Sequence, residues 1–382
     1  MQKKNEFKVI ALIIGFYKTA WYRVYCDHIG IAGNRRIFAE SDKQVREADL
    51  TKDDIRRYSR QSSMIYNRFS EYLKKKYGSK VYKLPINLPV SCPNRDGCVG
   101  SGGCCFCGEE GAGFENLSVE MSVRSQLEAN ARYISKNYKA EKFIAYFQNY
   151  SNTYLPMSSF SEYMQEACVE GVVALYISTR PDCVDDQRTD FLRQLKDERK
   201  VDIVVELGLQ SSNYRTLKWL NRGHGLAEFI DAVLRIKQWG LEVCVHMIND
   251  LPTDNAEDVV ESAKLLSALG VNQVKCHSLY ILENTALGDR YIKGEFQPLS
   301  MDEFIDRTIA FLEHLDPCIT VQRLIGRAPA ERTLFCNWDT SWWKVQEAIE
   351  KKMQQESRYQ GRCFDYLNGS ALRKAFGQIE AG

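Results

Sequence analysis

Short apolar segments recur along the chain from about residue 140, and helix-like patterns separate them. Five of these segments are rich in β-branched and aromatic residues and are apolar on both faces: 143–148, 172–179, 201–210, 241–248 and 271–281. They start roughly 30 to 40 residues apart, and the stretches between them have the polar–apolar pattern of amphipathic helices. Buried strands that alternate with helices predict parallel βα units.

An earlier segment of the same kind, residues 81–90, brings the predicted number of units to six. We expect an α/β fold, a partial (β/α)6 TIM-like barrel, which suits this order better than a doubly wound sheet, although the pattern alone allows both. The predicted domains are an N-terminal extension (1–62), the barrel (63–325) and a C-terminal helical cap (326–382). Residues 50–78, where the extension meets the barrel, should be helical, because Thr51 and Asp54 have capping-box spacing. In either fold, ligands bind at the carboxyl ends of the strands.

Composition changes this picture in one region only. The net charge is +1, and 44% hydrophobic and 26% charged residues are ordinary for a soluble globular protein. Residues 56–83, however, contain nine Lys or Arg and a single acid, together with six tyrosine or phenylalanine rings. Basic residues among aromatic ones can bind a nucleic-acid backbone and stack bases, but the same stretch also fits a solvated amphipathic helix.

We expect a cytoplasmic protein that does not enter a membrane. The apolar run Val9–Phe16 is shorter than the roughly 20 residues of a spanning helix, and no small-residue cleavage site follows it. Thirteen cysteines are present, and five of them lie within residues 92–107. An odd number with such a cluster favours a metal site in a reducing compartment over a disulfide framework.

Three of the clustered cysteines have a spacing that suits an iron–sulfur centre. Cys104 and Cys107 form a C-x-x-C pair, and Cys92 lies twelve positions before it in a glycine-rich stretch. Three thiolates can hold three irons of a [4Fe–4S] cluster and leave the fourth iron open to a ligand. Two alternatives remain at this point: a structural zinc site that also uses Cys98, and a redox C-x-x-C of the thioredoxin type.

Residues 84–113, LPINLPVSCPNRDGCVGSGGCCFCGEEGAG, resemble the cluster loop of radical S-adenosylmethionine (SAM) enzymes. The similarity is to the Fe–S oxidoreductase branch related to the Elongator catalytic subunit and the methylthiotransferases. It extends over roughly residues 64–350 through the stretches YFQNYSNTY, ISTRPDCVDD, VELGLQS and HSLYIL. The resemblance implies that Cys92, Cys104 and Cys107 bind the cluster, and it leaves Cys98 and Cys105 as spare thiols.

The resemblance also implies a second cofactor and its binding residues. SAM would be cleaved by the reduced cluster to give a 5′-deoxyadenosyl radical, and a flavodoxin or ferredoxin would supply the electron. No catalytic residue is assigned. The implied SAM-binding residues are Phe106 at the adenine, Gln148 and Asn149 at the amino group, Arg180 at the carboxylate, and Glu206 or Gln210 at the ribose.

One segment departs from the family pattern. The family usually has a Gly-Leu-Pro-Gly turn after the fifth strand, whereas this chain places Asp250 and Thr253 at the glycine positions. Side chains there restrict the backbone and occupy space, so we expect weaker SAM binding, a shifted pose or a divergent substrate.

The resemblance implies a function in tRNA modification, since the related branches act on tRNA bases, and a wobble uridine is the expected target. An enzymatic alternative is radical SAM chemistry on a small molecule or a protein side chain. A non-enzymatic alternative is a zinc-stabilised binding module.

Overall fold

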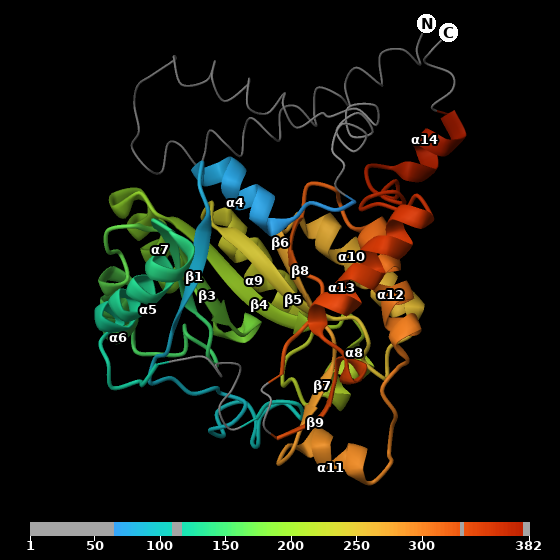
Figure 1. Ribbon diagram of the computed structural model, residues 1–382, viewed down its shortest axis with the longest axis horizontal. Coiled ribbons are helices and arrows are strands. Elements are labelled where there is room, and N and C mark those ends of the chain that lie inside the picture. Colours follow the sequence, from blue (N-terminus) through green and yellow to red (C-terminus); the bar gives the residue numbers. More distant parts are fainter. Residues whose placement is uncertain (1–64, 109–116, 329–331, 377–382) are drawn as a thin grey trace, which may run out of the picture. The chain divides into compact units, whose positions relative to one another are not determined.

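Seven parallel strands form one curved sheet in this computed structural model, which describes residues 65–108, 117–328 and 332–376 (Figure 1). The predicted α/β class and partial barrel are confirmed, with seven strands instead of six. The sheet order is β1-β2-β3-β4-β5-β6-β8. The strands are β1 (Val81–Ile86), β2 (Lys142–Phe147), β3 (Val172–Thr179), β4 (Asp202–Gln210), β5 (Glu242–Ile248), β6 (Gln273–His277) and β8 (Thr320–Arg323).

The last predicted strand, 271–281, is divided in two. The chain leaves the barrel after His277, because the backbone N–H of Leu279 donates to Oδ1 of buried Asp250 at 2.7 Å instead of continuing the ladder. The segment beyond this turn forms β7 (Tyr280–Leu282), which pairs antiparallel with β9 (Thr333–Cys336) in a separate two-stranded sheet.

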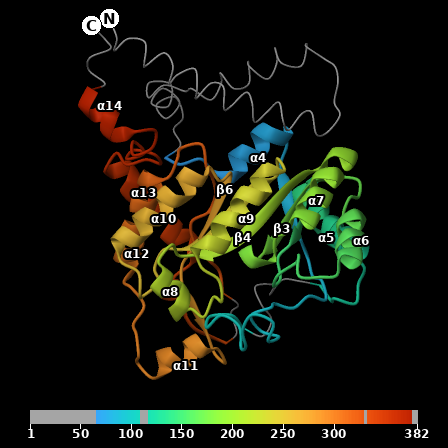
Figure 2. The same ribbon diagram turned by 180° about the vertical axis from the view of Figure 1, so that it is seen from behind.

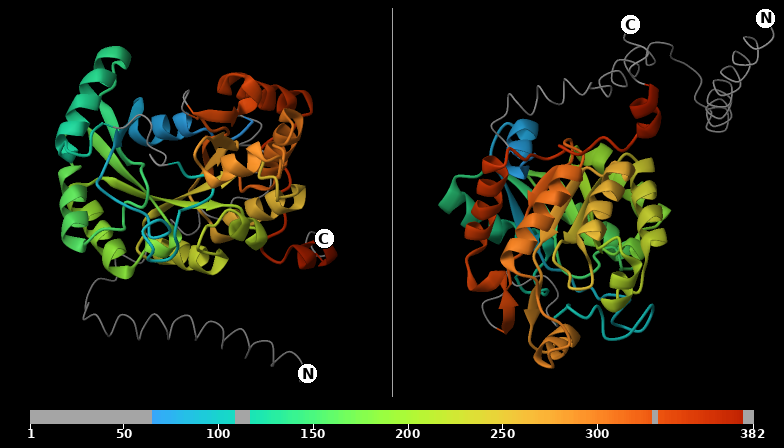
Figure 3. Two further views of the ribbon diagram at one scale, coloured as in Figure 1. Left: turned by 90° about the horizontal axis from the view of Figure 1, so that it is seen from below. Right: turned by 90° about the vertical axis from the view of Figure 1, so that its right-hand side faces the viewer.

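Helices cover the convex face of the sheet, as the views from behind and along the barrel show (Figures 2 and 3). Local sequence determines where these helices begin. In α10, for example, Asn255 and Asp258 form a capping box that fixes the first turn. The covering helices are α5 (Val123–Tyr138), α6 (Met157–Glu166), α7 (Asp186–Arg199), α9 (Leu226–Gln238), α10 (Ala256–Leu269) and α12 (Met301–His314).

Shorter elements and the C-terminal helices complete the described chain. The predicted helical region after residue 326 contains α13, whose Val345, Ile349 and Met353 join the main core. These elements are α8 (Tyr214–Trp219), α11 (Ala286–Ile292), α13 (Trp342–Gln355), α14 (Ser370–Phe376) and the 3-10 turns Pro181–Cys183 and Asn337–Asp339.

Successive side chains of each strand point to opposite faces of the sheet, so the outer face is apolar and the inner face contains both apolar and polar residues. In β4, Ile203, Val205 and Leu207 belong to the large core beneath the helices, whereas Val204 lies in a second, smaller cluster inside the half-barrel. Glu206 follows Val204 on the inner side, with its side chain fully buried. The strands are therefore apolar on both faces only near the amino end of the barrel, and charged residues follow further along.

Helix α4 (Phe69–Tyr77) fills the amino end of the half-barrel. Its Leu73 is buried with inward-facing residues of the strands, and Phe69, Tyr72 and Tyr77 pack against the same cluster. Lys76 Nζ donates to Glu242 at 2.7 Å. The described part of the basic and aromatic stretch thus uses its rings to pack one end of the barrel, opposite the cysteine-containing loop (cyan in Figure 1).

Some sequence predictions fall on residues outside the described ranges. These are the extension 1–62, the part of the predicted helix before residue 65 and the apolar run Val9–Phe16. In the described ranges, every helix is too short or too polar to cross a lipid bilayer.

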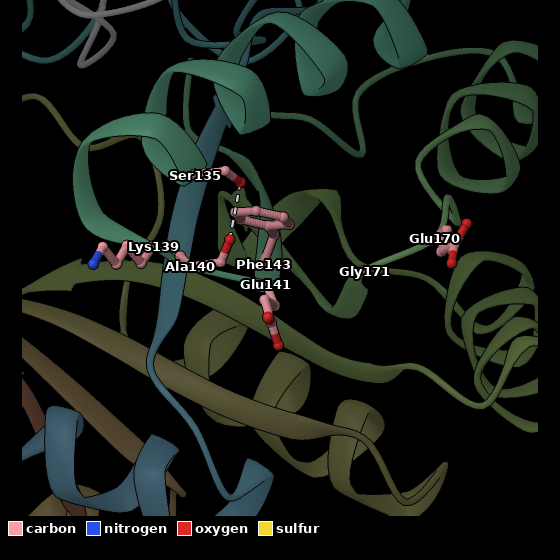
Figure 4. A pocket seen from close by; sticks show the side chains of 7 residues that line it. All are labelled: Ser135, Lys139, Ala140, Glu141, Phe143, Glu170 and Gly171. Carbon is pink, nitrogen blue, oxygen red and sulfur yellow. Dashed lines mark hydrogen bonds between the residues drawn. The ribbon is translucent and has the colours of Figure 1, made fainter.

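A surface hollow lies at the amino edge of the sheet, where β2 and β3 begin (Figure 4). The Ser135 hydroxyl donates to the carbonyl of Ala140 at 2.9 Å in its wall, which fixes the end of α5. Parallel sheets bind ligands at the opposite edge, so this hollow contributes nothing to the candidate site.

Candidate metal centre and cofactor site

The cysteine loop, residues 92–108, follows β1 and crosses the carboxyl end of the half-barrel. Its first turn is closed by the N–H of Arg95, which donates to the carbonyl of Cys92 at 2.8 Å, and Gly103 N–H donates to Asn94 at 2.8 Å. Gly103 has a φ of +79°, and a Cβ there would lie 2.9 Å from Arg95 Cγ, so a larger residue would strain the backbone and displace the Arg95 side chain. Cys105 is bonded through its backbone to Leu220 and Leu287, which anchors the C-x-x-C segment to α8 and α11.

Two of the predicted cluster ligands accept hydrogen bonds from nitrogen donors. Arg222 Nη1 lies 3.0 Å from Cys104 Sγ, and Asn94 Nδ2 lies 3.7 Å from the same sulfur. Arg95 Nη1 lies 3.7 Å from Cys107 Sγ. Donors of this kind stabilise thiolates and set the reduction potential of an iron–sulfur cluster.

The three predicted ligands lie within electrostatic range of one another. Burial raises the pKa of Cys107 to about 11, and the neighbouring Cys104 and Cys92 thiols contribute to the rise. In the described part of the chain, no three cysteine sulfurs lie within 4.8 Å of one another. The three thiols and their cationic donors form a set of groups that an iron–sulfur cluster can use.

The other two clustered cysteines have different surroundings. Cys98 is exposed, and Cys105 is buried in a hydrophobic cluster with Leu220 and Ile248. Burial raises the pKa of Cys105 to about 12. Phe106, predicted at the adenine, is half-buried and packs against this hydrophobic cluster. Its ring therefore supports the loop from below, and its contact with adenine stays a prediction.

Arg180, predicted to meet the SAM carboxylate, is 4% exposed and lies just after β3. Its guanidinium donates to both oxygens of Asp182, at 2.8 and 2.7 Å, and its buried Nη1 has no partner among the described residues. Burial lowers the pKa of Arg180, but the Asp182 carboxylate outweighs this effect, and the thiols of Cys104 and Cys92 add to the net rise. The group is thus a buried cation beside the cysteine loop with one donor available.

The predicted amino-group ligands follow β2. Asn149 is buried, its Nδ2 donates to Asn87 Oδ1 at 3.1 Å, and its Oδ1 has no partner. The half-buried Gln148 precedes it. An unpaired carbonyl oxygen is what an ammonium group can use as an acceptor.

Gln210, at the end of β4, lies beside Arg222. A Cβ on Gly208 would be 3.0 Å from Gln210 Nε2 and 3.1 Å from Arg222 Nη2, so this glycine leaves room for both side chains. Arg222 Nη2 is 2.9 Å from His224 Nε2. Burial, with the charge of Arg222, lowers the pKa of His224 to about 2, so its imidazole is neutral and accepts this hydrogen bond.

Glu206, the other predicted ribose ligand, is committed to an ion network deeper in the barrel. Its Oε1 accepts from Lys83 at 2.8 Å, and its Oε2 accepts from Lys275 at 2.9 Å. His246 Nε2 lies 2.8 Å from Oε2. Burial opposes ionisation of Glu206, but the charges of Lys275 and Lys83 outweigh it and hold its pKa well below the usual range.

The residues at the usual glycine positions of the turn after β5 have structural partners. Asp250 is 1% exposed and holds the N–H of Leu279, as described above. Thr253 Oγ1 lies 2.9 Å from Thr216 Oγ1. These side chains tie the turn to α8 and to the segment after β6, which gives them a role in the fold.

Sequence reasoning missed Arg222, Lys83 and Lys275. Arg222 and Cys104 are 118 positions apart, so their contact has no local pattern. The polar residues NRGH directly after α8 are the available signal, since they lie at the carboxyl edge of the sheet. Lys83 interrupts an otherwise apolar strand, as Glu206 does, whereas Lys275 lies between the polar Gln273 and His277 of β6.

Comparison with known proteins shows that the chain belongs to the radical SAM superfamily. The family described as "Radical SAM superfamily" matches residues 94–266, and the "Radical_SAM C-terminal domain" matches residues 271–355. Enzymes of this superfamily use a [4Fe–4S] cluster and SAM. The predicted family, the enzyme class and the two cofactors are thereby confirmed.

Individual relatives define the similarity further. "Uncharacterized protein YtqA" of Bacillus subtilis is 33% identical over 303 residues, 79% of this chain and 94% of that protein. A "tRNA uridine(34) acetyltransferase" of Methanocaldococcus infernus is 29% identical over 160 residues, which are 40% of this chain and 28% of that protein. The solved structure of "the archaeal Methanocaldococcus infernus Elp3 with N-terminus deletion" has a TM-score of 0.57 at 18% identity and covers 73% of this chain and 64% of that one. This likeness supports the barrel fold.

Proposed function

We propose that the chain is a radical SAM enzyme that modifies tRNA, and that Cys92, Cys104 and Cys107 hold its [4Fe–4S] cluster. The observation that carries the ligand assignment is the contact between Arg222 and Cys104 Sγ at 3.0 Å, beside two further thiols in electrostatic range. When bound, the cluster and SAM supply a carbon-centred radical that abstracts hydrogen from a substrate.

The residues of this chain have three tasks in that proposal. Arg222, Arg95 and Asn94 donate to the sulfur atoms and so stabilise the anionic ligand set. Arg180 offers its unpaired Nη1 to the SAM carboxylate, and Asn149 offers its unpaired Oδ1 to the SAM amino group. Buried groups with unsatisfied hydrogen-bonding capacity favour a polar ligand, because leaving them unpaired costs free energy.

Three further residues have weaker support from their surroundings. Gln210 lies next to Arg222 at the mouth of the barrel, which suits a contact with the ribose. Glu206 lies deeper, and five protein groups already surround its oxygens, so we propose Gln210 before Glu206 for this role. Gln148 and Phe106 keep their proposed places at the SAM amino group and adenine.

The tRNA substrate is proposed from the relatives. The matched part of the "tRNA uridine(34) acetyltransferase" from Methanocaldococcus infernus corresponds to 40% of this chain. An "Elongator complex protein 3" of Schizosaccharomyces pombe matches 43% of it at 24% identity. A wobble uridine is the proposed target, a flavodoxin or ferredoxin the proposed electron donor, and the cytoplasm the proposed location.

Two measurements test the proposal separately. Anaerobic reconstitution followed by iron, sulfide and 5′-deoxyadenosine analysis tests the radical chemistry; a reduced protein that binds SAM but forms no 5′-deoxyadenosine would contradict it. Nucleoside analysis of tRNA from a deletion strain tests the substrate. An unchanged nucleoside profile there would remove tRNA from the proposal and leave a small molecule or a protein side chain as the target.

A further inference from the structure

The inner face of the half-barrel has more positive than negative charge. Lys83 of β1, Lys275 of β6 and Arg323 of β8 face the interior, and Glu206 is the carboxylate that pairs with both lysines. With all four groups ionised, one negative charge faces three positive ones. Burial lowers the pKa of Lys83, Lys275 and Arg323. Because uncompensated charge in a protein interior is costly, an anion bound beside these groups would be stabilised.

Arg323 is the cation in this group with no acidic partner. Its Nη2 lies 2.8 Å from Nδ1 and 3.1 Å from Nε2 of His277, and its buried Nε has no partner in the part of the chain that the structure describes. A donor nearly equidistant from both ring nitrogens cannot align with the lone pair of either, so the imidazole is a weak substitute for an acceptor. Burial lowers the pKa of Arg323, and Tyr146, Tyr280 and Glu206 offset this only in part.

The two lysines share one counterion and are held in fixed positions. Lys275 Nζ is also 2.5 Å from the hydroxyl of Tyr146, and Lys83 Nζ donates to Gln322 of β8 at 2.7 Å, across the interior from β1. The side chain of Lys83 is nevertheless 21% exposed and that of His246 is 17% exposed. These inward-facing side chains therefore border water-accessible space next to the network.

The location of Arg323 connects this charge with the proposed radical site. Arg323 ends β8 and is paired in register with Lys275, and His277 ends the neighbouring β6. Tyr280 lies within electrostatic range of both Cys107 and Arg323. A group bound at Arg323 would therefore be near the mouth of the barrel, between the ion network and the cysteine loop.

We propose that Arg323, supported by Lys275 and Lys83, binds an oxyanion of the substrate, a carboxylate or a phosphate, inside the half-barrel. A guanidinium presents paired N–H donors that match both kinds of anion. The proposal rests on the proposed function only in taking the barrel interior as the substrate site of the radical chemistry. A carboxylate would come from a small co-substrate, and a phosphate from a nucleotide of the nucleic acid.

Calorimetric titration of the full chain with its cluster and SAM in place tests the site. The probes are acetate, malonate and methyl phosphate, each at constant ionic strength in chloride. Binding of either carboxylate but not of methyl phosphate supports a carboxylate substrate, and the reverse supports a nucleotide phosphate. Binding of both supports an oxyanion site without choosing its source, and binding of neither overturns the proposal.

Variants separate this site from general effects of charge. Arg323→Gln should weaken binding of the preferred anion by at least about tenfold, and Arg323→Lys, which keeps the charge, should retain part of it. Arg235→Gln is the matched control, because Arg235 lies on the outside of α9 with Asp186 and Asp231. Equal anion affinity of Arg323→Gln and wild type would overturn the proposal. If Arg323→Gln does not fold, the anion affinity of Arg323→Lys is compared with that of wild type instead.

The outcome is independent of the tRNA proposal. Anion binding by the purified protein together with an unchanged tRNA nucleoside profile would remove the tRNA substrate and keep the site. An altered nucleoside profile with no anion binding would keep the tRNA substrate and remove the anion site.

Discussion

Replacing Glu206 by glutamine should strongly destabilise the barrel. The substitution preserves the shape of the side chain but removes the counterion of Lys83 and Lys275, which bind it at 2.8 and 2.9 Å. Removing one partner of a buried ion pair typically costs about 3 to 5 kcal/mol, because the remaining charge is left uncompensated. For a chain of 382 residues, such a loss lowers the melting temperature by roughly 4 to 6 °C.

Urea unfolding of the full chain, followed by tryptophan fluorescence, measures this loss. The control is Glu347→Gln, since Glu347 is about half exposed on α13 and pairs with Lys351; its cost should stay below about 1 kcal/mol. The double variant Glu206→Gln/Lys275→Met should lose less free energy of unfolding than the sum of the losses in the two single variants, by more than about 1 kcal/mol. If Glu206→Gln were as mild as Glu347→Gln, the lysines would not depend on Glu206, and the charge argument for the barrel interior would be wrong.

Three further predictions concern the site and its supporting turn. Cys104→Ala should abolish iron incorporation on reconstitution, whereas Cys105→Ala should retain it; equal iron contents would contradict the ligand assignment. Arg180→Gln should weaken SAM binding about tenfold, measured by equilibrium dialysis, without changing the iron content. Burial raises the pKa of Asp250 from 3.8 to about 7, so its stabilising contribution is complete below pH 4 and is lost as the pH rises through 7. Asp250→Asn should therefore gain stability relative to wild type between about pH 4 and 7 by up to a few kcal/mol in urea unfolding, and a constant difference across this range would refute this.

The sequence predicts most of the fold because the strands bury apolar side chains on their outer face. The outward residues of β4, Ile203, Val205 and Leu207, give a pattern that needs no knowledge of the partners. Strand β8 has no such signal: it is four residues long, and Val321 is its contribution to the core. Its place in the sheet depends on pairing with β6, a contact between distant segments that local periodicity does not record.

The candidate site could be predicted only where its residues are close in sequence. Cys92, Cys104 and Cys107 lie in one loop, so their spacing and their resemblance to a known loop were visible. Arg222 reaches Cys104 across 118 positions, and no property of either residue specifies that contact. The charges of the barrel interior were visible singly, as Glu206 within an apolar strand, but their joint balance depends on the curvature that brings β1, β4, β6 and β8 together.

The position of α4 has a consequence for the order of events during turnover. Because Leu73 and its neighbours fill the amino end of the half-barrel, a molecule that reacts inside does not enter through that end. If cofactor and substrate both enter from the carboxyl end, the one that binds later would cover the one that binds first. A polymeric substrate at the carboxyl end of the barrel would insert one protruding group while the rest of the polymer stays outside. Release of the spent cofactor would then have to wait until the polymer dissociates.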